Sequence, residues 1–139
     1  MSTDLQWLLI RGNNSFIVKR VPEGPIFSKE PGNLRNLHSH KYSGIANSKT
    51  VIVKDTGADV QISFNKKGAS TQAVKPGRSS HAIKSRSGSR RSLGVTSRLF
   101  KRGYRPDLRQ AALARVSAVL ASRKEHKSRP EKKPRGKKA

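Results

Sequence analysis

Residues 50–64, TVIVKDTGADVQISF, carry the clearest structural signal in the chain. The segments TVIVK and VQISF are rich in β-branched and aromatic residues, and the five residues DTGAD between them include a glycine. Two strand-forming runs joined by so short a connection are typical of an antiparallel hairpin. A further strand is predicted over residues 79–84, which follow the breaker pair Pro76 and Gly77.

The residues before the hairpin predict a helix followed by a strand. Residues 2–12 have leucines at helical spacing, and Thr3 stands where it can cap the helix N-terminus. Residues 15–20, SFIVKR, alternate as a strand does, and prolines and glycines follow them. Residues 26–47 have a mixed composition that allows a short strand around Tyr42.

Two helices and a basic tail are predicted after the strands. The first helix ends at about residue 102, and the second begins at Pro106, a favoured first helical position. One side of the second helix is an apolar arc of about 140°: Leu108, Ala112, Leu113, Val116, Val119 and Leu120. Its other side is rich in alanine, which permits close approach of a flat partner or tight packing on a sheet. The tail holds nine Lys or Arg and no aromatic or branched aliphatic residue.

Together these elements predict an α+β fold. We expect a small, mainly antiparallel sheet with an N-terminal helix, two C-terminal helices and a basic tail that is disordered when free. The composition changes at residue 85, where Ser, Arg and Gly become dominant. We therefore divide the chain into a small α+β core domain over residues 1–84, a basic helical extension over 85–122 and a basic tail over 123–139.

The positive charge is the dominant feature of the composition. The 139 residues include 31 Lys plus Arg and 8 Asp plus Glu, which gives a net charge of +23. Charge at this density opposes compaction, so we expect a polyanion to neutralise it. Residues 60–106 contain twelve Lys or Arg and no acid, whereas an ordinary solvated face mixes both signs. The pattern favours a nucleic-acid-binding protein over a merely solvated surface.

A cluster of cations stands at the start of the second C-terminal helix. The stretch KRGYRPDLRQAALARV places four of them there: Lys101, Arg102, Arg105 and Arg109. Free amides at a helix start already favour an anion, so the arrangement indicates a bound phosphate. The alternative is an internal salt bridge in which an arginine and Asp107 brace the turn, and both can hold at once. Tyr104 is interpreted as core in preference to a base-stacking residue.

The sequence carries no signature of catalysis or of a bound cofactor. Its acids are scattered, and no GxxxxGK[ST], GxSxG or HExxH motif occurs. There is no cysteine, and His38 and His40 have no second ligand cluster beside them, so we expect no metal site. No apolar run is long enough to cross a bilayer. We expect a soluble intracellular protein that is not an enzyme and uses no cofactor.

Several segments together resemble a known family. LQWLLIR, NSFIVKR, PGNL, KYSG, KTV and YRPDLRQAALARVSAVLASRK occur in this order in a eukaryotic large-ribosomal-subunit protein, the family numbered twenty-eight, which is distinct from the bacterial protein with that number. The resemblance covers residues 4–124. It implies a structural component of the cytosolic 60S subunit, with large-subunit rRNA and neighbouring ribosomal proteins as partners, that supports translation.

The resemblance also implies an rRNA-contacting role for residues in the matching motifs: Lys19, Arg20, Lys41, Tyr42, Lys49, Arg105 and Arg109. The acid-free segment of residues 60–106 adds five further predicted RNA-binding residues: Arg90, Arg91, Arg98, Lys101 and Arg102. Trp7, Phe16, Val18, Leu108 and Val116 are predicted to be core. With aromatic residues at 5%, we expect recognition of backbone and shape more than base stacking.

Two other classes share the basic tail and the small core. A chromatin or architectural DNA-binding protein would add a groove-entering helix or apolar wedges, and neither is evident. A ribosome-assembly factor would bind precursor particles and then leave. A protein assembled into subunits would pass through the nucleolus before it reaches the cytoplasm. KKPRGKK (132–138) is compatible with nuclear import and equally with an rRNA-binding tail.

Overall fold

A computed structural model describes residues 2–66, 68–70, 73–84, 86–101, 103–124, 128 and 136. In chain order its elements are α1 (Thr3–Ile10), β1 (Ile17–Lys19), β2 (Ile26–Ser28), β3 (Val51–Asp55), β4 (Asp59–Asn65), β5 (Arg78–Lys84), α2 (Ser89–Lys101), the 3₁₀ helix η1 (Pro106–Leu108) and α3 (Arg109–Ser122). The predicted α+β class is confirmed, with antiparallel pairing in both of its sheets. Of the basic tail, only residues 123, 124, 128 and 136 are among the described residues.

The larger sheet is built on the predicted hairpin. Strands β3, β4 and β5 pair in that order, all antiparallel, and Val53 lies opposite Ile62. Burial alternates along β4, where Val60, Ile62 and Phe64 are buried and their neighbours are not. This alternation with period two is what a sheet with one covered face requires.

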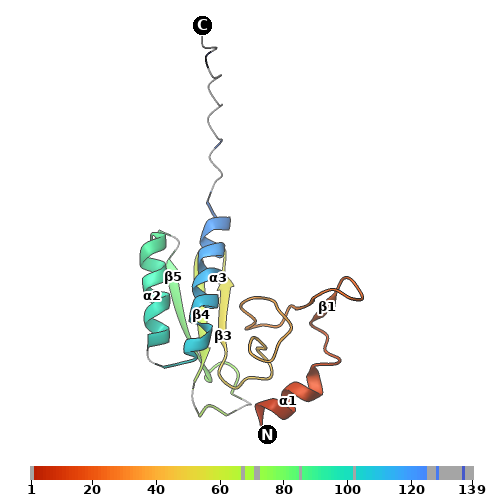
Figure 1. Cartoon of the computed structure of the whole chain (residues 1–139). Helices are drawn as coiled ribbons and strands as arrows, with labels where there is room; N and C mark the ends of the chain where they lie inside the picture. The colour runs from red at the N-terminus through yellow and green to blue at the C-terminus, as the bar shows by residue number, and fades with distance from the viewer. Residues whose placement is uncertain are drawn as a thin grey trace.

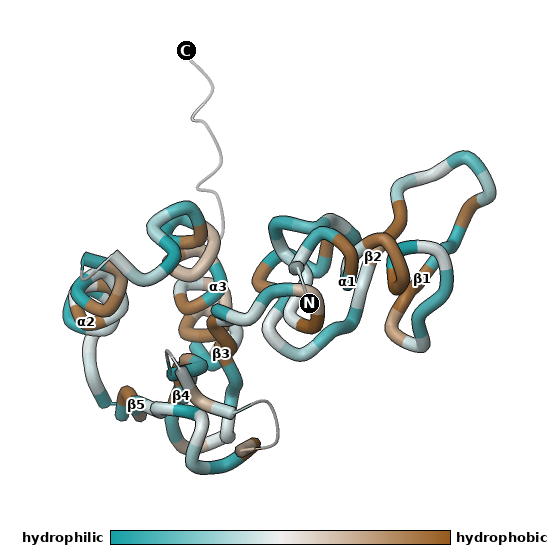
Figure 2. Tube along the Cα trace, turned by 90° about the horizontal axis from the view of Figure 1, so that it is seen from below, coloured by the Kyte–Doolittle hydropathy of each residue, from teal (hydrophilic) through white to brown (hydrophobic). Residues whose placement is uncertain are grey.

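Helices α2 and α3 cover that face. Figure 1 shows them side by side in front of the sheet, and Figure 2, seen from below, shows the helices and the strands as two layers. Both layers contribute to one buried cluster: Leu34, Val51, Val60, Ile62, Phe64, Ile83, Phe100, Leu108, Ala112, Val116 and Leu120. The apolar arc predicted for the last helix therefore faces the sheet, and Leu108 and Val116 are core as predicted. The division at residues 84 and 85 stays a prediction, although this cluster draws on both sides of it.

The last helix begins differently from the prediction. Pro106–Leu108 forms a 3₁₀ turn, and the α-helix starts at Arg109. Arg105 precedes the turn with φ 48° and ψ 62°, a left-handed backbone conformation that residues other than glycine rarely adopt. The contacts of its guanidinium, described below, hold it there.

The N-terminal arm lies beside the two layers (Figure 2). It consists of α1 and the β1–β2 hairpin, and α1 buries no residue completely. Three sequence predictions are wrong here. Ser2, not Thr3, caps α1 by accepting the amide hydrogen of Leu5. Trp7, Phe16 and Val18 lie outside the buried cluster, because the arm extends away from the sheet. Tyr42 lies in a turn and not in a strand.

Across the part of the chain that the structure describes, no helix is long and apolar enough to span a membrane.

Candidate nucleic-acid interface

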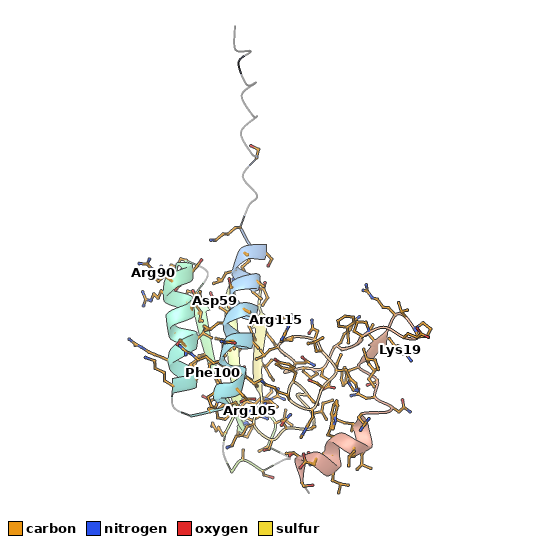
Figure 3. The ribbon with its side chains drawn as sticks, in the orientation of Figure 1. Lys19, Asp59, Arg90, Phe100, Arg105 and Arg115 are labelled. Carbon is orange, nitrogen blue, oxygen red and sulfur yellow. The ribbon has the colours of Figure 1, made fainter. Side chains whose placement is uncertain are left out.

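Four of the predicted RNA-binding residues form a single row on α2, which we call the α2 stripe: Arg90, Arg91, Arg98 and Lys101. All four are exposed, and at 100° per residue they fall within an arc of about 100°. The row is about 16 Å long at 1.5 Å per residue. Figure 3 shows the Arg90 side chain on the side of α2 that faces away from α3.

The opposite side of α2 explains why the stripe faces solvent. Ser92, Thr96 and Phe100 recur every four residues and are all buried. The Thr96 hydroxyl donates to the Ser92 carbonyl at 2.8 Å, and the Ser92 hydroxyl lies 3.2 Å from the Gly88 carbonyl. These short side chains satisfy their own polar atoms while they pack, so the basic side is the one left for a ligand. No acidic residue occurs in α2.

Arg105 acts as an internal brace. Its Nη2 lies 2.8 Å from Oδ2 of Asp107, its Nη1 donates to the Lys49 carbonyl at 3.1 Å, and its Nη2 also donates to the Lys41 carbonyl at 2.9 Å. Only 16% of the side chain is exposed. The salt-bridge alternative is therefore confirmed, and a phosphate contact at Arg105 stays a prediction.

The neighbouring predicted residues have mixed roles. Arg109 donates from Nη2 to the Ser97 hydroxyl at 2.8 Å and so links α3 to α2. Tyr104 is core, as interpreted: its ring meets that of Phe64 edge-on at 5.4 Å, and its hydroxyl donates to the Asn65 carbonyl at 2.8 Å. Burial raises the pKa of Tyr104. Arg102 lies outside the described residues.

The predicted residues fall into three groups. One is the α2 stripe. A second is at the start of the last helix, where the bonds from Arg105 draw in the backbone of Lys41 and Lys49. The third is Lys19 and Arg20, both exposed, on the β1–β2 hairpin. Figure 3 shows Lys19 and Arg90 on opposite sides of the molecule, so one flat surface cannot contact every group.

Sequence reasoning missed a fourth set of cations. Arg35 and Arg115 line a cavity of about 420 Å³ together with Lys41 and Tyr42. Arg35 lies in an irregular loop. Arg115 lies on α3 (Figure 3), so only the tertiary fold brings the two together. Their spacing in the sequence contains no signal of this contact.

Two aspartates, Asp55 and Asp107, are paired with arginines of the same chain. The hydrogen bond from Arg123 holds the pKa of Asp55 below its ordinary value, and the one from Arg105 does the same for Asp107. Arg123 also donates to the Asp59 carbonyl at 2.8 Å, which fixes the end of α3 to the β3–β4 turn. These carboxylates are paired with arginines outside α2, and α2 itself contains no acidic residue that could neutralise the α2 stripe.

The two histidines of the sequence pattern, His38 and His40, pack against α1. They lie against Trp7, with ring centroids 4.9 Å away for His38 and 5.8 Å for His40. His40 Nδ1 is 3.6 Å from Asp4 Oδ1, and His38 Nε2 is 2.9 Å from the Arg11 carbonyl. Among the described residues, no group of three or more potential metal ligands occurs.

Comparisons with a family profile and with individual known proteins point to the same family. The profile of the Ribosomal L28e protein family matches residues 5–122. A protein of Schizosaccharomyces pombe named large ribosomal subunit protein eL28 is 33% identical over 131 residues, covering 92% of this chain and 97% of its own length. The protein of the same name from Dictyostelium discoideum is 36% identical over 136 residues, covering 96% and 99% respectively. A third, from Caenorhabditis elegans, is 39% identical over 75 residues, which are 53% of this chain and 60% of its own.

Proposed function

Because the chain belongs to the Ribosomal L28e protein family, we propose that it is a structural constituent of the cytosolic large ribosomal subunit, where it neutralises rRNA phosphates. The family is one of ribosomal proteins, so the chain is not an enzyme, and the resemblance seen in its motifs is confirmed. Binding of large-subunit rRNA, contact with neighbouring ribosomal proteins and support of cytoplasmic translation are the parts that we propose.

The observation that carries the proposal is the α2 stripe. Four cations stand on one side of a helix whose opposite side is fixed to the core, and no carboxylate of that helix neutralises them. Such a row presents positive charge along a line, as an RNA backbone presents phosphates. Release of condensed counterions from the RNA drives this kind of binding, which is insensitive to sequence.

The other two groups extend the contact to different RNA segments. Lys19 and Arg20 project from the hairpin, and Lys41, Tyr42 and Lys49 lie near the start of the last helix. Because these groups point in different directions, we expect the protein to hold separate RNA segments together. Arg105 and Arg109 support this arrangement through contacts within the protein.

The deciding experiment is sedimentation of the tagged protein from a cell lysate on a sucrose gradient, with and without a wash at about 0.5 M salt. An integral subunit protein stays with large subunits, complete ribosomes and polysomes after the wash, at about one copy per subunit. Presence only in nuclear precursor particles would instead identify an assembly factor. Recovery with chromatin would identify a DNA-binding protein, and either result would refute the proposal. Nucleolar passage is tested by imaging the newly made protein.

A further inference from the structure

We propose that the cavity between α3 and the loop of residues 34–42 holds one unpaired nucleotide of the bound RNA, with its base against Tyr42. We call this cavity the Tyr42 pocket. The inference rests on the proposed function, since it takes the ligand to be RNA. It goes further by naming the structural element of the RNA that is recognised and the surface that recognises it.

The Tyr42 pocket has the size and the lining of a site for a flat ring. Its volume of about 420 Å³ is within the range of about 300–1,000 Å³ that small-ligand sites occupy. Its apolar wall consists of Leu34, Tyr42, Ala111, Ala114 and Ala118. The three alanines lie along one side of α3 and leave room that longer side chains would fill.

The rim of the pocket is cationic. The guanidinium carbon of Arg35 and the Nζ of Lys41 each lie 5.7 Å from the centroid of the Tyr42 ring, and Arg115 reaches the rim from α3. Asp107, which also lines the pocket, is paired with Arg105. An aromatic ring beside several cations is the combination by which proteins hold single-stranded nucleotides: the ring stacks with the base and the cations bind its phosphates.

The loop that carries Tyr42 is fixed before any ligand binds. On one side of Tyr42, the Lys41 carbonyl accepts a hydrogen bond from Arg105 at 2.9 Å. On the other, the Ser43 carbonyl accepts from the side-chain amide of Asn47 at 2.9 Å.

The buried carboxylate of Glu30 adds a further anchor, because the Ser43 hydroxyl donates to it at 2.7 Å. Because the residues on both sides of Tyr42 are held, the loop backbone loses little freedom on binding, which favours affinity.

An acidic protein segment is the other ligand class that these cations would attract. RNA is favoured because the pocket offers an aromatic ring and a shallow alanine wall, which suit the flat face of a base. The same molecule also carries the α2 stripe, so a single polyanion accounts for both surfaces.

The test compares two RNA hairpins that differ by one nucleotide. One is fully paired, and the other carries a single unpaired 2-aminopurine in its stem. Binding of the full-length protein is measured by anisotropy at fixed salt, and stacking of the unpaired base is followed by its fluorescence. We expect the bulged hairpin to bind about tenfold more tightly, with quenching of the fluorophore.

Four variants locate the effect. Tyr42→Leu removes the ring, and Ala114→Leu fills the pocket from an exposed position on α3 where it does not disturb the core. Both should bind the two hairpins equally, because the first lacks the stacking ring and the second lacks the room for a base. Tyr42→Phe keeps the ring, and Ala121→Leu makes the same change at an exposed α3 position outside the pocket, so both should keep the preference.

Equal binding of the two hairpins by the wild type, or a preference that survives in both Tyr42→Leu and Ala114→Leu, would overturn the inference. In either case salt-dependent binding of both hairpins would leave the proposed function intact. If neither hairpin bound, the proposed function itself would fail. Polyglutamate is added to the wild type as a competitor that resembles an acidic protein segment. If it abolished the preference for the bulged hairpin while the paired hairpin still bound, the pocket would be assigned to an acidic protein and the inference would be refuted.

Discussion

Arg105 donates through Nη2 to the carbonyl oxygen of Lys41, 64 residues earlier in the chain, at 2.9 Å. The same guanidinium donates to the Lys49 carbonyl and pairs with Asp107. The cation at the helix start thus has a structural role that its charge alone did not reveal. It joins the first turn of the last helix to the loop that presents Tyr42.

Replacing Arg105 by lysine should separate the contribution of the fork-shaped guanidinium to stability from that of its positive charge. Lysine keeps the charge but cannot reach both carbonyls and the carboxylate at once. We expect the free energy of unfolding to fall by about 1–2 kcal/mol, measured by urea denaturation. Arg109→Lys is the matched control, because only one hydrogen bond, to Ser97, is recorded for its side chain among the described residues. Equal losses in the two variants would contradict the bracing role.

Tyr104→Phe tests the second link between the helices and the sheet. The ring stays against Phe64, but the Asn65 carbonyl loses its donor at the end of β4. An unsatisfied, partly buried carbonyl costs about 1–2 kcal/mol, so the urea midpoint should fall while the slope with urea is unchanged. RNA affinity should stay as in the wild type. A variant as stable as the wild type would show that the hydroxyl contributes nothing to the fold.

Sequence patterns predicted the parts of this fold that depend on neighbours in the chain. The hairpin followed from two β-branched runs around DTGAD, and the buried side of α3 followed from apolar spacing that places Val116 on the sheet. Both patterns repeat with the period of their own element. The basic side of α2 also depends only on neighbours in the chain, because the exposed stripe and buried residues such as Thr96 lie on opposite sides of the same helix.

The remainder depends on contacts between distant segments. Nothing near Arg35 or Arg115 in the sequence indicates that they share a cavity, because an irregular loop brings them together. Trp7 has the apolar character of a core residue, yet it lies on the arm against His38 and His40. Apolar character shows that a side chain avoids water, but not which part of the protein covers it.

Gly44→Ala should destabilise the Tyr42 loop by steric conflict. A Cβ on Gly44 would lie 2.0 Å from the Pro31 carbonyl oxygen, which is backbone and cannot rotate away. The loops must separate, and the hydrogen bond from the Gly44 amide to Glu30 at 3.0 Å is disturbed. We expect a loss of about 3 kcal/mol in the free energy of unfolding.

Gly94→Ala is the control for that change. A Cβ at Gly94 meets nothing within 4 Å, and the residue is inside α2 with a helical neighbour on each side. Alanine should raise stability by about 0.5–1 kcal/mol because the unfolded chain loses freedom. Opposite signs for the two variants support the packing argument, and a stable Gly44→Ala protein would refute it.

The ion pair between Asp55 and Arg123 makes part of the stability depend on pH. Since the folded pKa of Asp55 is lowered, its contribution is fully present above the unfolded value of about 3.9 and is lost as pH falls through the folded pKa. Asp55→Asn should have a lower Tm at neutral pH. The difference from the wild type should shrink below about pH 4. Glu23→Gln, which removes an exposed acid of the hairpin arm, is the control for the loss of one negative charge at neutral pH.

Neutralising part of the α2 stripe should change the salt dependence of RNA binding more than the fold. Arg90→Gln with Arg98→Gln removes two exposed cations that we expect to contact one phosphate each. The slope of log affinity against log salt should then become shallower by about 1.4–1.8. The control pair Lys75→Gln with Lys84→Gln removes the same charge from exposed positions outside α2. If both pairs changed the slope equally, binding would depend on net charge alone, and the stripe would have no special role. A shallower slope only in the α2 pair would show that position on the helix, and not charge alone, determines the contact.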